Sequence, residues 1–414
     1  MYINPNKYDF FLFVQIMVLC LGNFGGALQA SRALAILLSP LLLSKICKKT
    51  YKYAGHIAKI LFLFYLYFLL SFFWTPDKAE AIKQLVYYPI HFILFLELIV
   101  FSRDAVNPLK SVSRGWLVAV LFCSAVAYWE ITTGNHLGTA YQHEDTFNTG
   151  AEILQHMTAS VTFYNYNSYV TFLCFCFPWI FFILLDRDCS VGEQVVSILA
   201  LFMAVLVIVI NASRGGLLTI ILMLSVYFFL SKKLQRKRIM LILGVIVVGF
   251  YCVNASNDVS TVMAVMKARA SDGGMFSGGS RYDIWLNVLS TFAGTGGFGV
   301  GIGGLHAAMR QHAPHSSITA SHNMFLEILS QYGVVITLTI ILFFCKLLKQ
   351  SFHRERNKKI VLLMALLTVP IYTMIDSMYL LNAHLYAHIA TIYIFANYEL
   401  IRYHNPILRT TAEL

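Results

Sequence analysis

Long apolar runs separated by short polar connections make up most of this sequence. A helix needs about 20 apolar residues to cross the hydrocarbon layer of a membrane, so the sequence predicts about twelve spans. They lie near residues 9–27, 30–46, 54–73, 84–102, 114–132, 158–185, 194–212, 214–231, 239–254, 321–349, 359–377 and 382–401. Three glycines, at 22, 25 and 26, interrupt the first two spans. We expect an all-α, polytopic membrane protein.

Composition excludes most other classes of protein. The 414 residues are 58% hydrophobic and only 12% charged, about half the charged fraction of a soluble protein, and the mean hydropathy is +0.67. A soluble globule of this composition would have too few polar groups to cover its surface. Six of the eight cysteines fall within apolar runs, at 20, 123, 174, 176, 252 and 345. We interpret them as small buried side chains and expect no disulfide framework or metal site.

The distribution of positive charge predicts the topology. The net charge is +11, but the basic residues form short runs between apolar segments, which is typical of cytoplasmic loops and not of a nucleic-acid surface. If both termini are cytoplasmic, about three quarters of the 31 Lys and Arg residues fall on the cytoplasmic side. The membrane domain then comprises residues 1–254 with spans one to nine, a long outer loop at 255–320, and residues 321–414 with spans ten to twelve and the tail.

Arg214 is the first candidate for chemistry, in the segment Asn-Ala-Ser-Arg-Gly-Gly between two apolar runs. Arginine near a membrane boundary is costly and usually paired or functional. Ser213 and the following glycines predict a helix that begins close to the surface, where its free amides and a guanidinium would form an anion site. The alternative is an interfacial arginine that snorkels to the headgroups.

Arg281 is the second candidate, in Gly-Gly-Ser-Arg-Tyr-Asp-Ile-Trp within the long outer loop. The pattern predicts a glycine-rich turn and then an amphipathic helix from Arg281 to about Phe292, on or in the outer leaflet. Arg281 would reach a second phosphate oxygen, while Tyr282 and Trp285 would anchor the helix at headgroup depth or stack on a sugar. The alternative is a solvated arginine paired with a nearby aspartate.

His322 is the third candidate, where the long loop re-enters the membrane at Ser-His-Asn. A histidine that is neutral near physiological pH suits general-base catalysis. The alternative is a hydrogen-bonded interfacial residue. What favours function is that this histidine ends the same loop that carries Arg281.

Three other patterns are weaker evidence for a functional site. The glycines between 299 and 304 fit a dinucleotide motif, but no βαβ unit accompanies them, and we interpret them as a backbone turn. His312 and His315 lack a carboxylate or cysteine at ligand spacing, so no metal and no other cofactor is expected. His384 and His388 share one helix face and are interpreted as packing residues.

Taken together, these motifs resemble the superfamily of O-antigen ligases and polymerases, bacterial membrane glycosyltransferases. The chain has Arg214 in Ser-Arg-Gly-Gly-Leu-Leu, a second arginine in the outer loop, and His322-Asn323 followed after nine residues by Gly333. Ile336 departs from the family's usual Gly, Thr or Tyr. Asn165 and Asn167 resemble the asparagine-bearing entrance to the family's sixth span. The resemblance covers about residues 160–345.

The resemblance implies a GT-C-type fold with a periplasmic loop helix. It also implies a multi-pass enzyme of the bacterial inner membrane, with cytoplasmic termini and a periplasmic active site. His322, Arg281 and Arg214 would be catalytic. The predicted substrate-binding residues are Asn323, Arg269, Tyr282, Trp285, Asn165, Asn167 and Arg310.

Enzymes of this kind move a polysaccharide from undecaprenyl diphosphate to an acceptor hydroxyl, without a metal and with inversion. The predicted partners are therefore the lipid-linked donor, lipid A core or another glycan acceptor, and membrane lipids, with no nucleic acid. A ligase acting on lipid A core is favoured, a repeat-unit polymerase is the alternative, and a polysaccharide flippase or transporter represents a different class.

Overall fold

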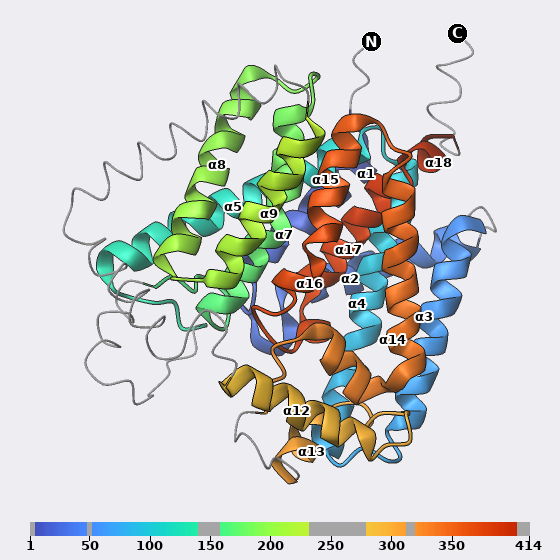
Figure 1. Cartoon of the computed structure of the whole chain (residues 1–414). Coiled ribbons are helices and arrows are strands. Elements are labelled where there is room, and N and C mark those ends of the chain that lie inside the picture. Colours follow the sequence, from blue (N-terminus) through green and yellow to red (C-terminus); the bar gives the residue numbers. More distant parts are fainter. Residues whose placement is uncertain (1–4, 48–51, 140–157, 232–278, 312–318, 404–414) are drawn as a thin grey trace.

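The computed structural model describes residues 5–47, 52–139, 158–231, 279–311 and 319–403. Within these ranges every regular element is a helix (Figure 1). The elements are α1 (Lys7–Met17), η1 (Val18–Leu21), η2 (Gly26–Leu28), α2 (Ala30–Cys47), α3 (Lys52–Ser71), α4 (Lys78–Asp104), α5 (Pro108–Thr133), α7 (Tyr166–Leu185), α8 (Val191–Ile210), α9 (Arg214–Leu230), α12 (Gly279–Ala293), α13 (Leu305–Gln311), α14 (Met324–Ser351), α15 (Arg356–Leu367), α16 (Val369–Tyr372), η3 (Tyr379–Leu381), α17 (Ala383–Ala396) and α18 (Tyr398–Tyr403).

The expected all-helical membrane architecture is confirmed in outline. Seven helices of the described chain are long and apolar enough to cross a membrane, namely α2, α3, α4, α5, α7, α8 and α14, and the shorter α9 and α17 are also apolar. The span expected at 239–254 lies outside the described residues. The total of about twelve spans and the GT-C class therefore stay predictions.

Several expected spans are broken helices. The span expected at 9–27 is the 11-residue α1, which continues as 3-10 turns up to the glycines. Residues 359–377 form α15 and the four-residue α16, and residues 382–401 divide into α17 and α18. In α14 the chain turns sharply at Gly333, which has φ 80° and ψ 179°. Continuous apolar sequence therefore overestimated helix length at these four places.

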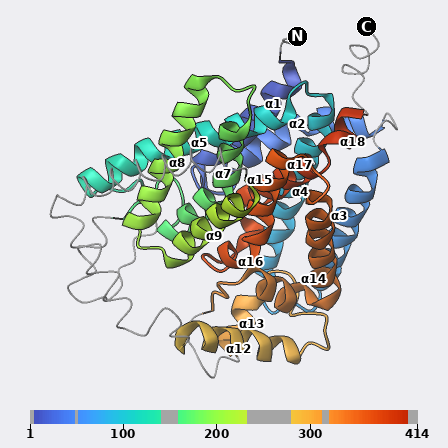
Figure 2. The ribbon, with the colours of Figure 1, turned by 45° about the horizontal axis from the view of Figure 1, so that its top comes forward.

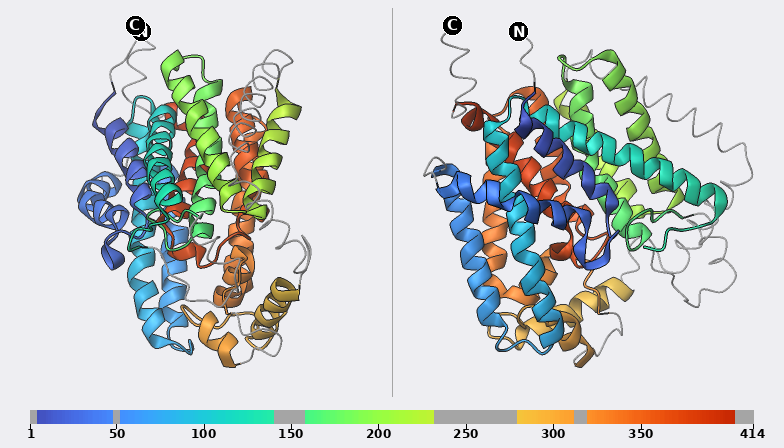
Figure 3. Two further views of the ribbon diagram at one scale, coloured as in Figure 1. Left: turned by 90° about the vertical axis from the view of Figure 1, so that its left-hand side faces the viewer. Right: turned by 180° about the vertical axis from the view of Figure 1, so that it is seen from behind.

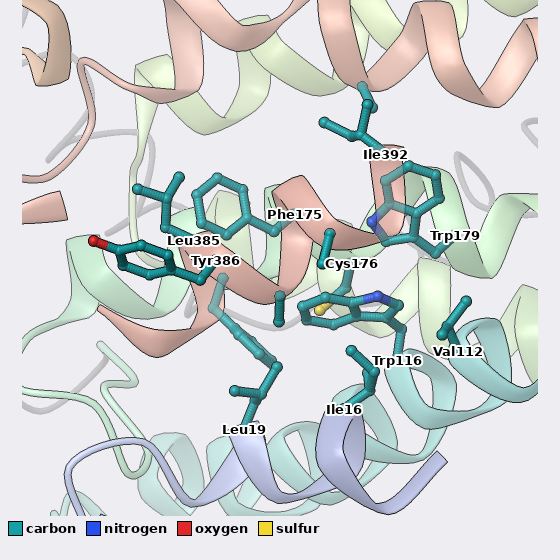
Figure 4. Packing of buried hydrophobic residues seen from close by; sticks show 14 of the residues in the cluster. Ile16, Leu19, Val112, Trp116, Phe175, Cys176, Trp179, Leu385, Tyr386 and Ile392 are labelled. Atoms are coloured by element: carbon teal, nitrogen blue, oxygen red, sulfur yellow. The ribbon is translucent and has the colours of Figure 1, made fainter. Parts of the chain in front are cut away.

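Helix α7 forms the centre of the bundle. Of its apolar window, 94% is buried, and α5, α8, α15 and α17 surround it (Figure 3). Figure 4 shows the resulting core, where Trp116, Phe175, Cys176 and Trp179 pack together with side chains of α17. Burial of large aromatic side chains contributes about 1.5–3 kcal/mol each, so this core fixes the ends of α7 and α17 on which the site depends.

The cysteines are free, as expected, in the part of the chain that the structure describes. Cys20, Cys123, Cys174 and Cys176 are buried, which confirms their interpretation as small core side chains. Cys345 is exposed on α14, so for this residue the interpretation was wrong. It lies in an apolar run because that face of a spanning helix is itself apolar.

Helix α12 lies across the end of the bundle opposite α18 (Figures 1 and 2). Its bounds, Gly279–Ala293, confirm the helix predicted from Arg281 to about Phe292. Its apolar face, Ile284 and Val288, packs in a small separate cluster with Leu305 and Met309 of α13. The helix is thus held to the protein through its apolar face, in addition to any contact that it makes with lipid.

Candidate active site

Three helices begin around one region of the molecule. Asn165 caps α7 by accepting from the Ser168 amide at 2.8 Å, and Ser213 caps α9 by accepting from the Gly216 amide at 3.3 Å. Asn323 caps α14 by accepting from the amides of its first turn, at 3.0 and 3.2 Å. Helix N-termini carry partial positive charge. Together with the arginines described below, they make this region favourable for an anion.

The turn before Arg214 is fixed by buried hydrogen bonds. The Asn211 amide group accepts from the Ala159 amide at 2.8 Å and donates to the Ala159 carbonyl at 2.9 Å. Ala212 has a positive φ of 49°, and a Cβ on Gly216 would overlap Val170 of α7. The glycine therefore permits α9 to start against α7. These contacts place Arg214, half-buried, at the first position of α9.

Arg281 lies beside Arg214 and His322. The packing around its guanidinium lowers its pKa, as does the charge of Arg214, while the hydroxyls of Tyr379 and Tyr166 raise the pKa. Two cations close to each other repel when no anion is bound between them, and a shared anion stabilises both. Two phenol groups lie next to this pair. The structure therefore brings the two arginines of distant segments together.

His322 has an unusual backbone and a free ring nitrogen. Its φ is 44°, a left-handed conformation in which histidine is several-fold enriched but still uncommon. One ring nitrogen is hydrogen-bonded to the backbone of Asp376, and the buried Nδ1 has no partner among the described residues. Burial, and then the charge of Arg281, lower the pKa of His322 below 6.5. The imidazole is neutral at pH 7 with one nitrogen able to accept a proton.

Trp285 holds the turn that carries His322. Its indole N–H donates to the Ser321 carbonyl at 3.1 Å, which joins α12 to the residue before the histidine. Met324 donates its amide to the Thr373 carbonyl at 3.1 Å. Hydrogen bonds before and after the histidine therefore fix the position of its backbone.

The segment 373–379 completes the site, and sequence analysis did not assign it a role. Tyr379 donates its hydroxyl to the Tyr372 carbonyl and accepts from the Asp376 amide, both at 2.8 Å. Met378 is in the left-handed region, with φ 56°, and donates its amide to Glu327 at 2.9 Å. A carboxylate in an apolar run, Asp376, was the one sequence signal for this segment.

The glycine turn at 296–304 inserts its backbone into the bend of α14. Because Gly333 departs from helical geometry, the carbonyls of Ser330 and Gln331 accept from the amides of Val300 and Gly301, at 2.8 and 3.0 Å. A Cβ on Gly299 would lie 2.7 Å from the Gln331 carbonyl oxygen. The interpretation of these glycines as a backbone turn is confirmed.

The structure places the predicted substrate-binding residues in different settings. Asn165 and Asn323 use their side-chain oxygens as helix caps, and Asn167 lies in the first turn of α7. Tyr282 is 60% exposed next to Arg281. Arg310 is exposed on α13 one turn after His306, whose pKa is lowered by burial and then by the charge of Arg310. Arg269 lies outside the described residues.

Metal binding was not expected, and the described ranges contain no group of three His, Cys, Asp or Glu side chains that could hold an ion. His312 and His315 lie outside these ranges. His388 is a packing residue, as predicted, because Trp179 donates to its Nδ1 and Tyr372 contacts its Nε2, each at 3.1 Å. His384 differs and is described below.

Comparison with known proteins agrees with the resemblance found in the sequence. Residues 199–341 match the model of the O-antigen ligase family, and this region contains Arg214, Arg281 and His322. The teichuronic acid biosynthesis protein TuaE of Bacillus subtilis (strain 168) is 25% identical over 282 residues, which are 66% of this chain. The alignment spans 56% of the relative's length. The predicted family resemblance is thereby confirmed.

Proposed function

We propose that this protein is a glycosyltransferase of the O-antigen ligase type, which moves a polysaccharide from undecaprenyl diphosphate to an acceptor hydroxyl at the periplasmic face. The observation that carries the proposal is the meeting of Arg214, Arg281 and His322, which come from three separate segments of the chain. The family match over 199–341 supports it. In this proposal both termini are cytoplasmic and the membrane is the bacterial inner membrane.

The arginines would hold the diphosphate of the donor. A charge-assisted hydrogen bond contributes about 1.5–3 kcal/mol, and a guanidinium can make two such bonds to one phosphate. Negative charge increases on the diphosphate as it leaves, so Arg214 and Arg281 stabilise the transition state more than the ground state. The N-terminus of α9 adds its amides to the same anion.

His322 would act as the general base. Its neutral Nδ1 takes the proton from the acceptor hydroxyl as the oxygen attacks the anomeric carbon. The new carbon–oxygen bond forms while the bond to the diphosphate oxygen breaks, and both electrons of that bond leave with the diphosphate. Attack from the face opposite the leaving group inverts the anomeric centre. The bond to the Asp376 backbone orients the ring for this step.

The acceptor distinguishes two members of this class. A ligase delivers the finished chain to lipid A core, whereas a polymerase delivers it to another lipid-linked repeat. The name of the relative, teichuronic acid biosynthesis protein, refers to the synthesis of a polymer, which favours the polymerase as the second candidate. Both reactions need the same two cations and base.

A reconstituted transfer assay with the host's own lipid-linked glycan tests the proposal. We expect His322→Ala to lower the transfer rate by about 10²–10⁴-fold and Arg281→Ala by about 10²–10³-fold. His353→Ala is the matched control, because this histidine is exposed just beyond the opposite end of α14, where its Nδ1 contacts the Lys349 carbonyl at 3.0 Å. Unchanged transfer in His322→Ala, or equal loss in His353→Ala, contradicts the assignment.

Gene deletion separates the acceptors. Loss of a ligase leaves long chains on the lipid carrier, whereas loss of a polymerase leaves single repeats, and gel electrophoresis of the surface polysaccharide resolves the two. Movement of lipid-linked glycan across liposomes without formation of a glycosidic bond would instead identify a transporter.

A further inference from the structure

A polar hollow lies beside the N-terminus of α7. It is formed by the α1–α2 connection, the residues before α7 and the start of α17, and it contains about 390 Å³ including its open mouth. Its polar lining residues are Asn23, Gln29, Ser31, Ser168, Asn382 and His384. No Asp, Glu, Lys or Arg lines it. A lining of this kind is suited to a neutral polar group.

His384 lines this hollow and has an unused hydrogen-bonding group. The side chain is only 6% exposed, and its buried Nε2 has no partner in the described part of the chain. Phe163, Phe172 and Phe175 surround the ring, with centroid distances of 5.9, 6.1 and 5.5 Å. A buried polar atom without a partner is destabilising unless a ligand or water completes it. His388, one turn further along α17, has partners at both ring nitrogens.

The hollow is one layer of side chains away from the reaction centre. Ser168 lines the hollow and lies beside the side chain of Asp376. The backbone of Asp376 in turn bonds to the ring of His322. A ligand in the hollow would therefore contact the same α7 turn whose first residue, Tyr166, lies beside Arg281.

The lining selects for neutral hydroxyl groups. Amide, hydroxyl and imidazole groups both donate and accept hydrogen bonds, as sugar hydroxyls require. The nearest cation in the sequence is Arg32, which is 4% exposed and already donates to the carbonyls of Ala27 and Leu381, at 3.0 and 3.2 Å, and to His91. An anionic group would therefore find no free positive charge in the lining. Tyr164, 48% exposed at the edge, offers a ring on which a sugar can stack.

We propose that this hollow is a subsite for one neutral sugar unit of the glycan, with His384 Nε2 bonded to a sugar hydroxyl. The proposal rests on the proposed function, since that function supplies the glycan. The sugar belongs to either the donor or the acceptor, and both present the same chemistry. None of the residues that define the subsite lies within 199–341, the part that matches the family model.

Saturation-transfer NMR of the detergent-solubilised full chain tests the subsite without requiring transfer activity. The probes are glucose, galactose, N-acetylglucosamine and N-acetylgalactosamine, with glucuronate as the charged comparison. We expect at least one neutral sugar to give a signal that falls at least fivefold in His384→Phe and persists in His384→Gln. If none of the neutral sugars binds, or if His384→Phe binds as the wild type does, the proposal is overturned.

Asn382→Ala provides a second variant should His384→Phe fail to fold, because Asn382 makes no capping bond to α17. The same loss of signal is expected, and an unchanged signal overturns the proposal. Arg281→Ala separates the two proposals: sugar binding should persist while transfer is lost. In the transfer assay, His384→Phe should raise KM about tenfold for whichever substrate carries the sugar. An unchanged KM for both donor and acceptor also overturns the subsite.

Discussion

Replacing Arg281 by glutamine should raise the pKa of His322. In the wild type, burial and then the charge of Arg281 lower this pKa below 6.5. Arg281→Gln removes the charge and leaves the burial in place, so the pKa should rise part of the way back. A general base acts in its neutral form, which is populated above its pKa. The acidic limb of the pH–rate profile should therefore move to higher pH by the same amount.

The expected shift is modest because Arg281, although its guanidinium packs against the site, still reaches water, which screens its charge. Exposed pairs of charged groups interact by about 0.2–1 kcal/mol. One pH unit corresponds to about 1.36 kcal/mol. The pKa of His322 should therefore rise by less than one unit toward its ordinary value, because the burial remains.

NMR titration of the histidine ring signals measures this shift without an activity assay. The chain has 13 histidines, so the spectrum of His322→Asn serves to identify the relevant signal. Arg281→Lys is the matched control, because it keeps the positive charge and loses the planar fork that binds a phosphate through two bonds. Both variants should lose transfer activity, but the titration should move in Arg281→Gln alone.

Two results would refute this reasoning. An unchanged His322 titration in Arg281→Gln would mean that the guanidinium and the imidazole do not share a site. An equal shift in Arg281→Gln and Arg281→Lys would mean that the substitution altered the packing around the histidine and that charge was not the cause.

Three further predictions concern the scaffold of the site. Gly333 has a φ of 80°, so Gly333→Ala should destabilise the protein by more than about 1–2 kcal/mol in thermal unfolding. Gly55→Ala is the control, because an added Cβ meets nothing there, and it should be neutral or stabilising by about 0.5–1 kcal/mol. Ser213→Ala and Ser190→Ala should each lower the free energy of unfolding by about 1 kcal/mol, because each removes a helix cap. Only Ser213→Ala should slow transfer, and equal transfer rates in the two variants would contradict a role for Ser213 at the site. Trp285→Phe should lower the free energy of unfolding by about 1 kcal/mol, because the indole hydrogen bond is lost. It should lower kcat by a larger factor than it raises the KM for the donor, and an unchanged kcat would exclude a positioning role for the indole.

The sequence by itself determined the class of protein and the identity of the charged groups. Apolar run length depends on local composition, so most expected spans, α12 and the three candidate side chains could be located without a structure. The motif around His322 and Gly333 was recognisable for the same reason, because its residues are close together in the chain.

Only the tertiary structure decided how these groups meet. The left-handed Met378 and the unpartnered nitrogen of His384 have no local signature, because their roles depend on contacts with segments far away in the chain. The bend of α14 depends on the amides of a glycine turn that precedes it by about 30 residues. Hydrophobicity, which is local, assigns a segment to the membrane. The direction of each polar side chain depends instead on which hydrogen-bonding groups the segments packed around it leave unpaired.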